Sequence, residues 1–466
     1  KIQALINVNT VVNSEDLTDD IHKDTLKVMA SIKDIQTNNG MAGCDRYVIS
    51  HAYSALTVIE VYGLLLMSGW QPGSVLVDIV PLFETIDDLN HAAGVMKELY
   101  ELPVYREHLQ LRKNKQTIML GFSDGTKDGG YLMANWSIYK AKEELTSISR
   151  AYGIDVIFFD GRGGPPARGG GKTHKFYASL GKNIANEQIQ LTIQGQTVSS
   201  NFGTIESAQF NIEQLINAGI SNDLFASQKV PLLDSEKELI QQLADRSFTA
   251  YMELKNHPNF LEYLGHASPL RFYAATNIGS RPAKRGGSGK LSLESLRAIP
   301  FVGSWSQLKQ NVTGYYGVGT AFKKMDEEGR WEELKKLYDK STFIKTLIAN
   351  CEMSMKKSFF PMTAFLSRHP VYGEIWSKMY EEYELTKQYI FRLTGKNELM
   401  ADYPVEQLSV QMRERIVLPL VTIQQYAITR VREMEEASSE SSYKQTLEKL
   451  VMRCSFGIIN AGRNSA

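Results

Sequence analysis

The segment best suited to chemistry is a basic, glycine-rich loop at residues 158–174, which reads FFDGRGGPPARGGGKTH. Its glycines allow positive φ angles and let backbone N–H groups approach a ligand closely. Arg162 and Arg168 add planar guanidinium groups that match phosphate and carboxylate oxygens. A flexible linker and an RGG-type RNA-binding segment are the alternatives, but the loop lacks interleaved aromatic side chains for base stacking. We therefore expect a folded anion-binding loop that acts as a mobile lid.

Acidic residues that could bind a hard cation follow two other apolar runs. Glu84 comes after the run at 75–83, and Asp124 lies with Lys127 in the segment SDGTKDGG at 123–130. Carboxylate oxygens suit a divalent cation, and the Lys127 ammonium suits an anionic substrate. The plainer interpretation of 123–130 is an Asp/Gly turn with helix-capping residues, and Glu84 alone resembles an ordinary surface or capping residue.

Regular strand-then-helix units are predicted to position these side chains. Unbroken apolar strands that alternate with helices indicate a parallel sheet buried on both faces. Right-handed crossovers place the C-terminal ends of such strands at one face, so we expect the acidic and basic residues to converge there. The predicted strands are 46–50, 75–83, 117–122, 155–159 and, as a fifth, 190–194, and the predicted helices between them are 55–68, 86–102 and 131–152.

The sequence becomes mainly helical from residue 206 onward, where a second basic cluster at 281–297 interrupts the pattern. The expected organisation is a helical lead-in at 1–45, the βα units with their metal and anion loops at 46–205, and a helical region at 206–466. The helices predicted in the last region are 235–255, 343–366, 373–393 and 407–437.

Composition narrows the class of protein. The 466 residues contain 52 Lys and Arg against 52 Asp and Glu, whereas general nucleic-acid binders usually have a basic excess. Three unpatterned cysteines disfavour a disulfide framework or a zinc site and favour a reducing cytoplasm. No apolar run reaches the length of a membrane span, and no signal peptide is recognised. The chain opens on Lys1 instead of Met, which we interpret as a fragment.

Five segments together resemble the signatures of phosphoenolpyruvate carboxylase, in that family's order: 81–89, 121–128, 161–174, 279–285 and 294–300. The likeness runs from about Tyr47 to the C-terminus. It implies an α/β, predominantly helical fold, with a (β/α) TIM-like barrel that is incomplete in this chain and a large C-terminal α-helical region. The family's barrel has eight strands, and its members are cytoplasmic tetramers.

The resemblance also implies a reaction. Phosphoenolpyruvate and bicarbonate give oxaloacetate and phosphate through carboxyphosphate and an enolate, with Mg²⁺ or Mn²⁺, as an anaplerotic supply to the tricarboxylic acid cycle. The residues that match the family's functional positions are Glu84 and Asp124 as metal ligands; Arg162, Arg281 and Arg297 for substrate and intermediate; Arg168 of the mobile loop; the active-site Lys127; and Lys357, Arg413 and Asn464, which with Arg168 hold an inhibitor such as aspartate or malate.

Three departures from the family pattern bear on activity. Asp160 stands where the family usually has a catalytic histidine, the loop contains Pro165-Pro166-Ala167, and the family's N-terminal half is missing. A carboxylate about 4 Å from a bound anion costs about 4 kcal/mol at an effective dielectric of about 20. Asp160 must therefore be metal-bound, paired with an arginine such as Arg162, or protonated.

We expect the isolated chain to bind Mg²⁺ and phosphoenolpyruvate weakly and to turn over little, because missing strands leave open sheet edges. Two other functions remain open. One is a non-catalytic, metabolite-sensing homologue, and the other is a different Mg²⁺-dependent barrel enzyme that handles phosphoryl groups.

Overall fold

The computed structural model describes residues 1–8, 10–193, 195–225, 231–273, 292–438 and 441–463. The chain forms two compact units. Unit 1 comprises Lys1–Gly121, Ser137–Gly161 and Lys182–Leu191, and unit 2 comprises Phe122–Trp136, Arg162–Gly181 and Thr192–Ala466. The three-part division expected from the sequence stays a prediction.

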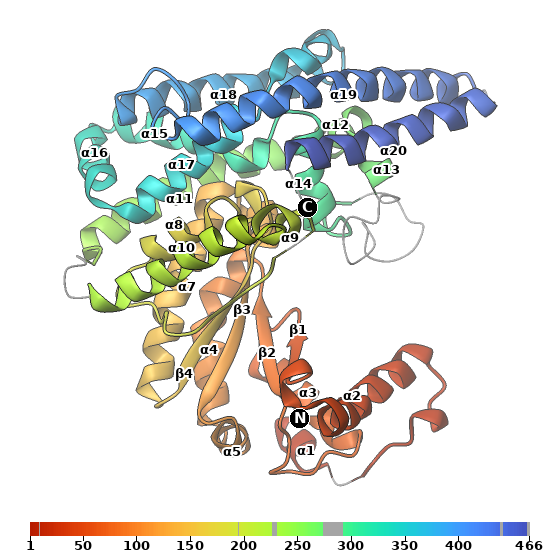
Figure 1. Ribbon diagram of the computed structural model, residues 1–466, viewed down its shortest axis with the longest axis vertical. Helices are drawn as coiled ribbons and strands as arrows, with labels where there is room; N and C mark the ends of the chain where they lie inside the picture. The colour runs from red at the N-terminus through yellow and green to blue at the C-terminus, as the bar shows by residue number, and fades with distance from the viewer. Residues whose placement is uncertain (9, 194, 226–230, 274–291, 439–440, 464–466) are drawn as a thin grey trace. The chain divides into compact units, whose positions relative to one another are not determined.

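Unit 1 is built on a five-stranded parallel sheet whose strands follow one another in chain order (Figure 1). This confirms the predicted strand-then-helix units and the parallel sheet. The TIM-like barrel, expected to be incomplete in this chain, stays a prediction. The strands are β1 (Arg46–Ile49), β2 (Asp78–Phe83), β3 (Lys115–Gly121), β4 (Asp155–Gly161) and β5 (Ile189–Leu191).

The apolar composition of the central strands explains their position. Every residue of β2 is buried, and Ile118 and Leu120 of β3 are fully buried. The register pairs Phe83 of β2 with Leu120, and it pairs Leu120 with Asp160 of β4. The C-terminal ends of β2, β3 and β4 therefore lie side by side at one edge of the sheet.

Helices of unit 1 precede the sheet and alternate with its strands. Thr85 and Asp88 form a capping box that starts α4, and Pro103 occupies the first turn of α5, where its missing N–H costs nothing. The helix predicted at 86–102 therefore ends as expected, and a further helix that was not predicted begins at Pro103. The helical elements are α1 (Ile2–Ile6), η1 (Ser14–Asp16), α2 (Asp20–Asn39), η2 (Met41–Gly43), α3 (Ala55–Met67), α4 (Ile86–Glu101), α5 (Pro103–Leu111) and α7 (Tyr131–Ala151), which begins in unit 2.

Unit 2 is helical where it is described (Figure 1). Its last two helices pack along each other through Val417, Val421 and Ile428 on one side and Val451 and Ile458 on the other. The elements are α6 (Phe122–Gly129), η3 (Pro166–Arg168), α8 (Thr173–Ser179), α9 (Gln196–Phe202), α10 (Ile205–Leu224), α11 (Asp234–Lys255), α12 (Phe260–Ala267), α13 (Leu270–Tyr273), α14 (Ala298–Gln307), η6 (Val312–Gly314), α15 (Val318–Glu327), α16 (Trp331–Lys340), α17 (Thr342–Lys356), η7 (Phe360–Arg368), α18 (Gly373–Thr394), α19 (Pro404–Glu436) and α20 (Ser442–Gly462).

Two predictions about unit 2 need correction. The helix predicted at 343–366 ends at Lys356, and a separate 3₁₀ segment begins at Phe360, with Pro361 in its first turn, where a missing N–H is tolerated. The turn predicted at 123–130 is the helix α6. Its glycines are poor helix formers, but its last carbonyls are satisfied from α11: the hydroxyl of Tyr251 donates to Lys127 O at 3.0 Å, and Lys255 Nζ donates to Asp128 O at 2.9 Å.

The glycine-rich loop is packed tightly against unit 2. Gly169 and Gly171 have φ angles of +76° and +96°, which strain any other L-residue. A side chain at Gly169 would overlap the ring of Phe122, and one at Gly170 would overlap the backbone carbonyl of Gly164. The glycines thus let the loop fold onto the protein itself.

Two simpler expectations can be compared directly with the structure. Cys44, Cys351 and Cys454 are all free thiols, as their spacing predicted. Among the described residues, no helix is both long and apolar enough to cross a bilayer.

Gly170→Ala is predicted to lower the free energy of unfolding by about 1–3 kcal/mol, the usual cost of overpacking, because backbone atoms must move. Urea unfolding measures the change. Gly94→Ala is the matched control. Gly94 lies within α4 with open space around it, so alanine should raise the free energy of unfolding by about 0.5–1 kcal/mol. Equal stability of Gly170→Ala and the natural protein would contradict the packed loop.

Candidate active site

The acidic residue after β2 lies against the end of β3. Glu84 is half-buried, and a Cβ added at Gly121, the last residue of β3, would lie 3.2 Å from Glu84 Cγ. The backbone N–H of Glu84 donates to Asp88 Oδ2 at 3.2 Å, within the cap of α4. The capping box therefore fixes the backbone position from which the Glu84 side chain extends.

The end of β4 contains a buried ion pair that sequence reasoning missed. Lys142 Nζ of α7 lies 2.7 Å from Asp160 Oδ1 and 2.8 Å from Oδ2, and the two side chains are 1% and 0% exposed. The same ammonium lies 4.9 Å from the centre of the Phe158 ring. Of the three states expected for Asp160, the structure supports pairing, but with a lysine.

A signal for Lys142 was present in the sequence. It lies four residues after Ile138 and three before Leu145, so it falls on the apolar stripe of α7. A lysine on such a stripe needs a buried anionic partner. Lysines on helices usually extend to solvent even from such a position. The stripe alone therefore did not identify Asp160 as the partner of Lys142.

In unit 2, α6 presents Asp124 and Lys127. Asp124 is half-buried, and Lys127 Nζ donates to the carbonyl oxygen of Leu296. Leu296 directly precedes Arg297, the residue that caps the start of α14. The structure therefore places Lys127 beside the segment that bears Arg297, and convergence of their side chains on one ligand stays a prediction.

Both described loop arginines are buried in unit 2. Arg162 is 4% exposed; its Nε donates to Gly169 O at 2.5 Å, and its guanidinium carbon lies 4.3 Å from the centre of the Phe176 ring. Arg168 is 2% exposed, and its Nε donates to Ser123 Oγ at 2.9 Å. Since Ser123 precedes Asp124, Arg168 is held against α6.

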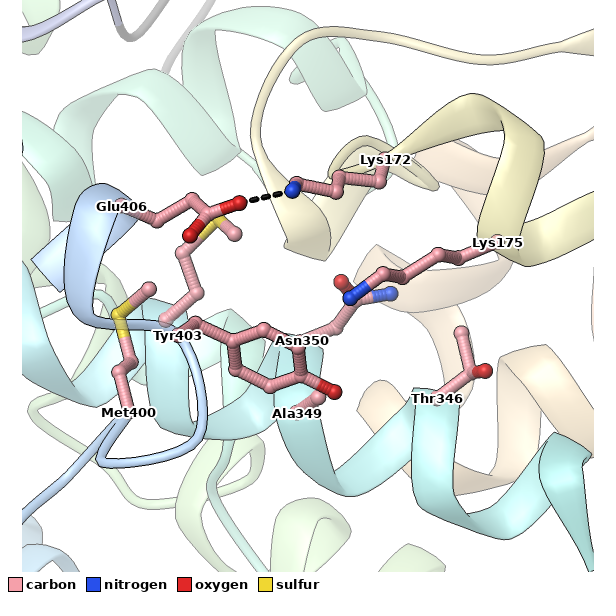
Figure 2. Close-up of a pocket in the computed structure, with 9 residues that line it drawn as sticks. Lys172, Lys175, Thr346, Ala349, Asn350, Met400, Tyr403 and Glu406 are labelled. Atoms are coloured by element: carbon pink, nitrogen blue, oxygen red, sulfur yellow. Dashed lines mark ion pairs between the residues drawn. The ribbon is translucent and has the colours of Figure 1, made fainter. Parts of the chain in front are cut away.

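The far end of the loop is anchored at a small pocket, which Figure 2 shows. Lys172 forms an ion pair with Glu406 of α19, and Lys175 Nζ lies 3.8 Å from the centre of the Tyr403 ring. Asn350 of α17 fills the space where Gly171 has no side chain. The loop is thus tied to two helices of unit 2. Its predicted motion as a lid stays a prediction.

Two of the residues expected to bind a dicarboxylate inhibitor, Lys357 and Arg413, lie in a basic cluster. Burial, together with the nearby charges of Lys309 and Arg413 and against that of Glu414, lowers the pKa of Lys357 to about 8. Lys309 is buried and pairs with Glu414 at 2.7 Å. Burial and the charge of Arg463 likewise lower the pKa of Arg413. Such a concentration of cations favours an anionic ligand.

Two other expected site residues, Arg281 and Asn464, lie outside the described residues. Across the part of the chain that is described, no group of three or more His, Cys, Asp or Glu side chains comes together as a ready-made metal cage. Mg²⁺ does not require such a cage, because it usually keeps several waters and takes one or two protein carboxylates besides substrate oxygens.

Comparison with known proteins gives a consistent result. Residues 2–465 match the family described as phosphoenolpyruvate carboxylase. Relatives with that name include proteins from three bacteria. The proteins of Corynebacterium diphtheriae, Nitrosomonas europaea and Thermosynechococcus vestitus are 36%, 32% and 32% identical over 76%, 95% and 93% of this chain.

The matched regions are only part of those relatives. They cover 40%, 49% and 43% of the respective proteins, so this chain spans less than half of the length of each. The match of residues 2–465 to the family model, together with these relatives, shows that the chain belongs to the phosphoenolpyruvate carboxylase family.

Proposed function

We propose that the protein carboxylates phosphoenolpyruvate with bicarbonate to give oxaloacetate and phosphate. A bicarbonate oxygen attacks phosphorus, and the bond from phosphorus to the enol oxygen breaks, leaving carboxyphosphate and the enolate of pyruvate. Carboxyphosphate releases CO₂ and phosphate, and the methylene carbon of the enolate then bonds to CO₂. Membership of the family supports this reaction, and the burial of Arg162 and Arg168 in one glycine-rich loop is the observation that favours it most.

A divalent cation is part of the proposal. Glu84 and Asp124 would hold Mg²⁺ or Mn²⁺: Glu84 lies against Gly121, and Asp124 is three residues further along the chain. When bound, the ion would neutralise charge that develops on phosphate and enolate oxygens. We further propose that the five-stranded sheet belongs to an eight-stranded TIM-like barrel with its site at the C-terminal strand ends.

The basic residues divide into two proposed groups. Arg162, Arg281, Arg297 and Lys127 would bind the phosphoryl group and the enolate, since charge-assisted donors stabilise oxyanions most strongly where water is excluded. Arg168 would enter the site when the loop closes. Arg168 already donates a hydrogen bond to Ser123, the residue directly before Asp124.

Regulation would use the basic cluster. Lys357, Arg413 and Asn464 would hold aspartate or malate together with Arg168, which keeps the loop arginine away from the reaction. Lys309 and Arg463 add charge to the same cluster. A cytoplasmic homo-oligomer, a tetramer as in the family, completes the proposal.

Substitution of Arg162 tests the proposal. In the complete protein, Arg162→Ala should lower kcat/KM for phosphoenolpyruvate about 10- to 150-fold, because a hydrogen bond to a charged group contributes about 1.5–3 kcal/mol. The measurement is bicarbonate-dependent formation of oxaloacetate.

Arg150→Ala is the matched control, because Arg150 is exposed at the end of α7 and should be replaceable without loss. Unchanged kcat/KM in Arg162→Ala would remove Arg162 from the site. If the unsubstituted protein consumed phosphoenolpyruvate without bicarbonate, it would be a different phosphoryl-handling enzyme. Tight malate binding without turnover would indicate a metabolite sensor.

Inhibition should depend on pH through Lys357. The ammonium is the form that binds a dicarboxylate, and with a pKa of about 8 it is mostly present at pH 7 and mostly lost at pH 9. The inhibition constant for malate should therefore rise roughly tenfold between these pH values. Lys357→Arg keeps its charge throughout and should abolish the rise. A rise of equal size in Lys357→Arg would show that another group titrates.

A further inference from the structure

We propose that Lys142 is a positioning residue of the carboxylation site, which neutralises Asp160 at the edge of the sheet where the anionic substrates bind. The inference rests on the proposed function. It gives a role to a lysine that matches none of the family signatures recognised in the sequence, and it changes the role expected for Asp160 from catalysis to support.

The geometry of the pair is that of a permanent ion pair. The ammonium of Lys142 lies within 2.8 Å of both carboxylate oxygens of Asp160, and neither side chain is more than 1% exposed. Charges buried to this extent are tolerated when they are paired and hydrogen-bonded. A lysine on the apolar stripe of α7 and an aspartate at the end of β4 thus require each other.

The direction of the Asp160 side chain argues against acid–base catalysis. Phe158 and Asp160 are two residues apart on β4, so their side chains point to the same face of the sheet. Lys142 of α7 contacts both, with its Nζ 4.9 Å from the centre of the Phe158 ring. The carboxylate therefore faces α7, and Asp160 does not inherit the role of the histidine for which it stands.

Charge explains why the pair matters for substrate. Asp160 precedes Arg162 by two residues, and its strand neighbour is Leu120 at the end of β3. An uncompensated carboxylate there would repel bicarbonate and the phosphate of phosphoenolpyruvate, and it would compete with them for Arg162. The ammonium of Lys142 cancels that field without occupying the substrate site.

Three variants of the complete protein separate this electrostatic role from a purely structural one. Lys142→Gln leaves an unpaired carboxylate and should raise KM for bicarbonate at least about tenfold. Asp160→Asn leaves an unpaired ammonium and should leave that KM unchanged or lower it. Asp160→Asn combined with Lys142→Gln has a neutral pair and should return KM to within about threefold of the natural value. Lys97→Gln, on an exposed lysine of α4, is the matched control and should change nothing.

The opposite signs of the two single variants decide the test. If both shift KM for bicarbonate in the same direction, or if Lys142→Gln folds and leaves KM unchanged, the inference is overturned. Where Lys142→Gln does not fold, KM of Asp160→Asn and of the double variant still decides it: a raised KM in Asp160→Asn overturns the inference. Oxaloacetate formation by the unsubstituted protein is measured first, so failure of the proposed function is recognised separately.

Discussion

A parallel sheet constrains where its chemistry can lie, because every strand ends at the same edge. In unit 1 the register aligns the ends of β2, β3 and β4, and Glu84 and Asp160 emerge at that edge. The segments that leave the edge are the ones that bear α6 and the glycine-rich loop. Residues far apart in the sequence therefore follow neighbouring strand ends, and the remaining helices fix the directions in which their side chains point.

This arrangement buries several charged side chains, which is unfavourable unless each has a partner of opposite charge nearby. The buried Lys142 pairs with Asp160 and the buried Lys309 with Glu414, while Lys172 pairs with Glu406 at a more exposed position. Other basic side chains near these pairs can still attract anions. They are the loop arginines in one region and Lys357 with Arg413 in the other. A chain with no net charge can thus present two basic sites.

Periodicity made the strands, most of the long helices and the strand-end candidates predictable from the sequence. It did not reveal α6, because a segment rich in glycine and aspartate is helical only when Tyr251 and Lys255 satisfy its carbonyls. Nor did it identify the partner of Asp160, since Lys142 is 18 residues away and on another element. The prediction that the loop glycines approach a ligand stays a prediction, and the sequence did not reveal that Gly169, Gly170 and Gly171 also pack against Phe122, the loop backbone and Asn350. Tertiary contacts between distant segments decide all three features.

The most direct test of the convergence of strand ends is to locate Mn²⁺ by anomalous scattering in crystals of the complete protein. The account predicts one manganese ion coordinated by the carboxylates of both Glu84 and Asp124, with guanidinium groups of the glycine-rich loop facing the same side of the ion. Manganese held elsewhere, or Glu84 and Asp124 on separate surfaces, would contradict it.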